Sequence, residues 1–84
     1  MLMTACATTP PVQEMSDARQ AISAAEQAAA AERAPDVLSE ARRLLAEAEQ
    51  QIRAEAYGLA RANALRARNR AVQALELAQA ADNP

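Results

Sequence analysis

One repeating pattern in the last third of the chain limits what it can fold into. Small or apolar residues recur there at steps of three and four: Tyr57, Ala60, Ala64, Ala67, Ala71, Ala74, Ala78 and Ala81. This heptad-like spacing predicts a long helix with one apolar face. Alanine favours helix, and its methyl group lets a neighbouring backbone approach closely. We therefore predict that the residues from Tyr57 to Ala78 form a helix-packing interface.

The size of the apolar side chains limits the stability of such a fold. Hydrophobic residues make up 51% of the 84 residues, but most of them are alanine and Tyr57 is the single aromatic residue. At about 25 cal/mol per Å² of buried apolar surface, an alanine-lined core stabilises less than a leucine core of equal length. We expect a marginally stable monomer, or a chain that gains stability by self-association or by docking on a partner.

Two more helices are predicted upstream of the alanine-rich one. The first should begin at Ser16 or Asp17, since either residue can cap a helix, and should continue until Pro35 interrupts it. The second should run from about Pro35 to Arg53, because proline suits the first turn of a helix. Leu38, Ala41, Leu45, Ala48 and Ile52 mark its inner face.

The charges are divided unevenly between the two parts of the chain. Residues 1–50 hold 4 Arg against 8 acidic residues, whereas residues 51–84 hold 5 Arg against 3. This division suits packing of the basic last helix against the acidic part, or contacts between copies, and also fits an ordinary solvated surface. Nucleic-acid binding is not expected, since Arg61, Arg66, Arg68 and Arg70 do not share one helix face.

The first residues, Met1 to Cys6, resemble the end of a bacterial lipoprotein signal, in which the cysteine becomes the lipidated first residue of the mature protein. No basic segment precedes Cys6 and the apolar stretch is short, so this chain as written could not be exported. We expect a start placed too far downstream or a clipped chain. A true start at Met1 would instead make the protein cytoplasmic. No internal segment approaches the ~20 apolar residues that span a bilayer, so membrane attachment would be through Cys6.

Residues 7–15 read as a tether, because the consecutive prolines Pro10 and Pro11 favour an extended chain. The expected organisation is therefore a truncated signal end and linker at 1–15, followed by a helical domain at 16–82. Ala7 stands directly after the cysteine in place of the aspartate that resembles an inner-membrane retention signal. By that resemblance, the outer membrane is the expected location.

A wider resemblance covers about residues 13 to 81. Its motifs are Ser16 to Ile22, then Ala34-Pro35, then the apolar positions from Leu38 to Ala48, and finally the alanine pattern from Tyr57 to Ala71. These resemble a family of alanine-rich helical lipoproteins of Gram-negative bacteria, domain of unknown function 4398, some members of which carry an OmpA-like domain. The family usually has Gly-Asp-Tyr before the last helix, whereas this chain has Glu55-Ala56-Tyr57 with Gly58 following.

The expected fold is all-α: a small up-down-up three-helix bundle with a long alanine-faced C-terminal helix. A turn between Arg53 and Gly58 lets the alanine face fold back and be buried. The alternative is a helical hairpin in which the second and third helices fuse, because Arg53 to Ala56 are competent helix formers and Gly58 costs only about 1 kcal/mol inside a helix.

No motif for catalysis or cofactor binding is present. The chain has no histidine and a single cysteine, and Ser16, Ser23 and Ser39 are typical of cap or surface positions. Gly58 is the only glycine, so there is no glycine-rich phosphate loop. We expect no enzyme, no cofactor, no metal and no small-molecule substrate.

Three functional hypotheses follow from these patterns. The first is a lipid-anchored structural or interaction protein of the Gram-negative envelope, facing the periplasm, which acts through helix packing as a homo-oligomer or with an envelope protein. The second is a soluble helical binding module or accessory subunit of a larger protein. A third, a lipid- or polymer-binding carrier, needs a cavity that alanine packing tends to close.

Overall fold

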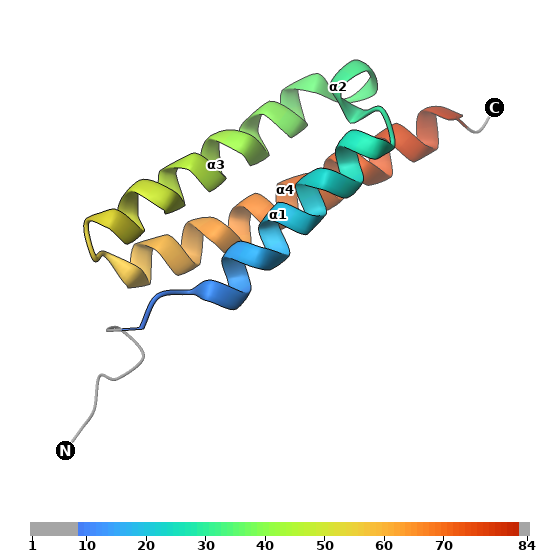
Figure 1. Cartoon of the computed structure of the whole chain (residues 1–84). Helices are drawn as coiled ribbons and strands as arrows, with labels where there is room; N and C mark the ends of the chain where they lie inside the picture. The colour runs from blue at the N-terminus through green and yellow to red at the C-terminus, as the bar shows by residue number, and fades with distance from the viewer. Residues whose placement is uncertain (1–8, 83–84) are drawn as a thin grey trace.

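The computed structural model describes residues 9–82, and these residues form an all-α bundle. Its helices are α1 (Val12–Gln27), α2 (Ala30–Arg33), α3 (Pro35–Arg53) and α4 (Tyr57–Asp82). α1 and α4 run in the same direction and α3 runs against them, so the three long helices make an up-down-up bundle (Figure 1). α4 approaches both α1 and α3 more closely than these two approach each other. The predicted all-α three-helix architecture is confirmed, with α2 as one additional helical turn.

Small and large side chains alternate across the bundle axis. In one layer Met15 of α1 meets Ala48 of α3 and Ala64 of α4. In the next layer Leu44 of α3 meets Ala18 and Ala67. The buried part of each of these two layers combines one long side chain with two alanines, which fills the space between three closely spaced helices.

The predicted start of the first helix is wrong. α1 begins at Val12, four residues before Ser16, so its first turn lies in the segment expected to be a linker. Met15 is only 2% exposed in its layer, so helix formation from Val12 buries a large apolar side chain. Pro11 stands at the N-cap position, where its missing N–H costs no helical hydrogen bond.

The predicted end of the first helix is also wrong, because the helix stops before Arg33. α1 ends at Gln27, and Ala29 adopts a left-handed conformation with φ of 66° before the single turn of α2. This break redirects the chain so that Ala30 and Ala34 are buried in the cluster that also contains Ala78. Alanine is helix-competent at each of these positions, so local propensity does not signal the break.

The predicted second helix is confirmed at both ends by α3. Pro35 lies in its first turn and Asp36 follows it, where a negative charge favours the helix N-terminus. Leu38, Ala41, Leu44 and Ala48 are the buried residues of this helix.

A tight turn separates α3 from α4, so the alternative of one fused helix is wrong. The backbone N–H of Glu55 donates to the carbonyl of Ile52 at 2.9 Å, and that of Ala56 donates to Gln51 at 2.8 Å. Glu55 has a φ of 60°. This pair of bonds around a left-handed residue is a Schellman motif, in which glycine is the usual residue. Here a glutamate occupies the left-handed position and Gly58 lies inside α4.

Candidate functional site

The apolar face of α4 is the main candidate for function that the sequence singles out. Its six inner members, which we call the alanine stripe, have no solvent exposure: Ala60, Ala64, Ala67, Ala71, Ala74 and Ala78. All but Ala60 belong to clusters that also contain residues of α1 and α3. The stripe therefore packs against helices of the same chain.

The two ends of the longer pattern differ from the stripe. Tyr57 is half-buried at the start of α4, and Ala81 is exposed, contrary to the expectation from its spacing. Ala81 is exposed because α4 continues beyond the part covered by α2 (Figure 1). The Arg33 guanidinium of α2 donates to the carbonyl oxygen of Ala78 at 3.4 Å, which marks the last covered turn.

Ion pairs connect the basic α4 to both of its neighbours. Arg61 donates to Glu14 of α1 at 3.0 Å, and Arg70 is 3.3 Å from Glu40 of α3. A hydrogen bond from its own backbone N–H lowers the pKa of the Glu14 carboxyl, partial burial opposes this, and Arg61 lowers the pKa further. The sequence division between acidic and basic parts thus corresponds to contacts within one chain.

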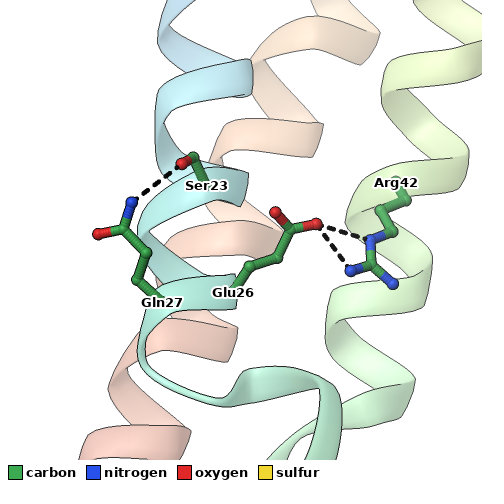
Figure 2. Close-up of polar contacts among 4 residues, drawn as sticks. All are labelled: Ser23, Glu26, Gln27 and Arg42. Carbon is green, nitrogen blue, oxygen red and sulfur yellow. Dashed lines mark hydrogen bonds and ion pairs between the residues drawn. The ribbon is translucent and has the colours of Figure 1, made fainter.

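A second set of ion pairs joins α1 to α3. Figure 2 shows Glu26 of α1 reaching toward Arg42 of α3, whose Nε and Nη2 donate at 3.2 and 2.7 Å. Arg19 and Glu49 form a similar pair at 3.3 Å. These pairs are half-exposed, so each adds only a few tenths of a kcal/mol, but together they bridge the two long helices that are least closely packed.

Asn63 is a buried polar residue of α4 that no motif in the sequence singles out. Its side chain is only 7% exposed and donates to the Gln51 Oε1 atom of α3 at 3.0 Å. Arg66 in turn donates to the Asn63 Oδ1 atom at 3.2 Å. Both ends of the amide are therefore satisfied, and the hydrogen bonds connect the start of α4 to the end of α3. The partner residue is distant in sequence, so no local signal reveals it.

A shallow cavity of about 200 Å³ lies between α3 and α4. It is lined by Glu40, Leu44, Arg66, Asn69, Arg70 and Gln73. The Glu40–Arg70 ion pair neutralises part of its charge. Pockets that bind small molecules usually have volumes of ~300–1,000 Å³, so this cavity offers little room for a ligand.

A family model places the chain among known sequences. The model described as domain of unknown function DUF4398 matches residues 13–83. The chain belongs to this family. The match includes α1, α2, α3 and α4 with the whole alanine stripe. Searches of curated proteins and of solved structures found no match.

The part of this DUF4398 domain that the structure describes has neither a metal-binding cluster nor a membrane-spanning helix. Among residues 9–82, no three His, Cys, Asp or Glu side chains gather closely enough to hold a metal ion. None of the helices in this range is both long enough and apolar enough to cross a bilayer.

The outer surface of α4 carries most of the exposed apolar side chains of the described DUF4398 domain. Leu59 is 61% exposed and Leu77 45% exposed, while Leu65 and Val72 lie nearer the centre of the helix. On the same helix, Arg66 and Arg68 donate to the side chains of Asn63 and Asn69. Cys6, the predicted lipidation residue, lies outside the described residues.

Proposed function

We propose that the chain is a non-enzymatic structural or interaction domain of the Gram-negative cell envelope, held at the periplasmic face of the outer membrane by a lipid on Cys6. The resemblance of Met1 to Cys6 to the end of a lipoprotein signal supports the lipid, and the short separation between Cys6 and the start of α1 at Val12 supports a role close to the membrane. Even a fully extended segment of this length reaches only about 20 Å. A lipid on Cys6 would therefore keep the start of α1 next to the membrane surface.

This attachment point also sets an orientation. The start of α1 and the α3–α4 turn lie toward the same end of the bundle, whereas α2 and the end of α4 lie toward the other (Figure 1). In the proposed arrangement α2 and the last turns of α4 point away from the membrane, where periplasmic partners are accessible.

The alanine stripe is occupied within the chain, so contact with a partner would use another surface. The exposed sides of α4 fit this role, since Leu65 and Val72 are exposed on one side and Leu59 and Leu77 on another. Leu65 and Val72 are seven residues apart and therefore share one face of the helix, as the apolar residues of a docking surface must. The same observation supports the second candidate function, a soluble helical module that docks on a larger protein without a lipid.

Mass spectrometry of the chain isolated from native membranes tests the lipid anchor. We expect a diacylglyceryl group on Cys6 as the first residue, and we expect Cys6→Ser to move the protein from the membrane fraction to the soluble fraction. An unmodified Cys6 in a soluble protein would refute the anchored form and leave the docking module.

Photo-crosslinking tests the outer side of α4 separately. A photoreactive residue replacing Val72 should give a defined crosslinked product in cells, whereas the same residue replacing Ser23, which is exposed on α1, should give none. Equal products from both positions would argue against a specific contact surface on α4.

A further inference from the structure

We propose that two copies of this chain exchange α4, forming a dimer in which α3 and α4 are one continuous helix. The first observation is the backbone of the α3–α4 turn, where Glu55 has a φ of 60°. An L-residue in this left-handed region is strained by contact of its Cβ with the following carbonyl oxygen. Short hinge segments under strain favour domain exchange, because opening them relieves the strain.

The residues of the α3–α4 turn make few contacts that would be lost if the turn opened. Arg53, Ala54 and Glu55 are exposed, so straightening this segment uncovers no buried side chain. All of the residues from Arg53 to Ala56 are helix-competent, and no proline follows Pro35 before α4 ends. A Cβ added at Gly58 would meet no atom within 4 Å, so this position also leaves room for a regular helix. Helical hydrogen bonds would replace the two bonds of the turn.

The contacts of α4 are suited to exchange, because they are made with elements on the other side of the turn. The alanine stripe packs against α1 and α3. Arg61 pairs with Glu14 of α1, and Arg70 pairs with Glu40 of α3. In the exchanged dimer the same contacts form between α4 of one copy and α1 and α3 of the other. The partner is therefore a second copy of this chain, in which the surfaces of α1 and α3 already match α4 in shape and charge.

The balance between the two forms depends on protein concentration. Both forms bury the same stripe, so the contacts cancel and the difference lies mainly at the turn. Dimerisation removes the left-handed Glu55 from both copies but costs translational and rotational freedom. The exchange involves only residues of the helical bundle and needs neither a lipid on Cys6 nor a membrane.

A distance across the turn distinguishes the two forms. Ser39 and Gln73 are exposed, and each lies within three residues of the Glu40–Arg70 ion pair, so the closed hairpin keeps them far closer than a continuous helix would. In a continuous helix they would be about 50 Å apart, at 1.5 Å per residue. We would place spin labels at Ser39→Cys and Gln73→Cys in a full chain carrying Cys6→Ser, and dilute it with unlabelled chain so that only distances within one copy are measured.

The expected result is a long intramolecular distance in a fraction of the molecules. This fraction should increase with protein concentration, in parallel with the fraction of dimer in sedimentation experiments. Glu55→Gly should raise the dimer dissociation constant by about tenfold or more, because glycine relieves the strain in the turn and weakens the continuous helix. The matched control is Ala29→Gly, at φ of 66° in the other connection. It should leave the dissociation constant unchanged, because the α1–α2 connection is the same in both forms.

Two outcomes would overturn the proposal. One is a short Ser39–Gln73 distance at every concentration with no dimer. The other is a dimer in which the intramolecular distance stays short, because such a dimer associates through an outer surface with its turns closed. Equal effects of Glu55→Gly and Ala29→Gly on the dissociation constant would show that strain at the turn is not the cause of dimerisation.

Discussion

The close packing of the alanine stripe predicts that Ala67 tolerates neither a smaller nor a larger side chain. Ala67 has no solvent exposure and lies in one layer with Ala18 and Leu44. Ala62 is on the exposed side of the same helix and is the matched control. Both positions have the same helical backbone, so the difference between them isolates the effect of packing.

The magnitudes follow from separate contributions at the two positions. Ala62→Gly should lower the free energy of unfolding by about 1 kcal/mol through helix propensity alone. Ala67→Gly should lower it by about 2 kcal/mol, because the loss of a buried methyl group adds about 0.8 kcal/mol. Ala67→Leu forces extra atoms between close backbones and should cost about 1–3 kcal/mol or more, whereas Ala62→Leu should be nearly neutral.

Urea unfolding followed by circular dichroism measures these four variants at equal protein concentration. For a domain of this size each 1 kcal/mol corresponds to about 4–8 °C in the thermal midpoint, which gives an independent check. If Ala67→Leu were as stable as Ala62→Leu, the stripe would have space for a larger side chain. The claim that alanine is needed there for close helix approach would then be wrong.

Three further perturbations test the turn, the first turn of α1 and the buried amide. Glu55→Gly should raise the free energy of unfolding by about 1 kcal/mol under conditions where the protein is monomeric. Ala54→Gly, at a φ of −88°, should lower the free energy of unfolding. Urea unfolding measures both changes. The lowered folded-state pKa of Glu14 contributes stability that is present above the carboxyl's usual pKa and is lost as pH falls through the folded-state value. Glu14→Gln should therefore flatten the acidic limb of a plot of thermal midpoint against pH. Asn63→Ala should lower the free energy of unfolding, measured by calorimetry, by about 1 kcal/mol. The double variant with Gln51→Ala should lose less than the sum of the two single losses, because the two side chains share one hydrogen bond.

The start of α3 could be predicted from the sequence because it depends on local chemistry. Pro35 disfavours helix at the residue before it and fits the first turn of the next helix, so the start is set within a few residues. The heptad spacing of α4 is equally local, and the six alanines from Ala60 to Ala78 are all buried. In both cases a short stretch of sequence contains the information that decides the structure.

The ends of α1 could not be predicted, because tertiary contacts decide them. Met15 extends the helix toward Val12 by packing against α3 and α4. At the other end Ala29 leaves the helix although alanine has the highest helix propensity, because the chain must redirect to bury Ala34. The buried amide of Asn63 has the same origin, since its partner Gln51 becomes a neighbour only after the hairpin forms.

The alanine pattern determines which face of α4 is buried, but it contains no information about which chain buries it. The same steps of three and four describe the stripe in a monomer and in an exchanged dimer. Whether α4 packs within its own chain or against a second copy depends on the α3–α4 turn. There Glu55 has the left-handed conformation that favours glycine, whereas Gly58 lies in a helix. Moving the glycine from one position to the other changes no contact of the stripe. Glu55→Gly changes the free energy of the turn, whereas Gly58→Ala stabilises α4 equally in both forms. The variant carrying both substitutions therefore separates the packing of α4 from the choice of partner.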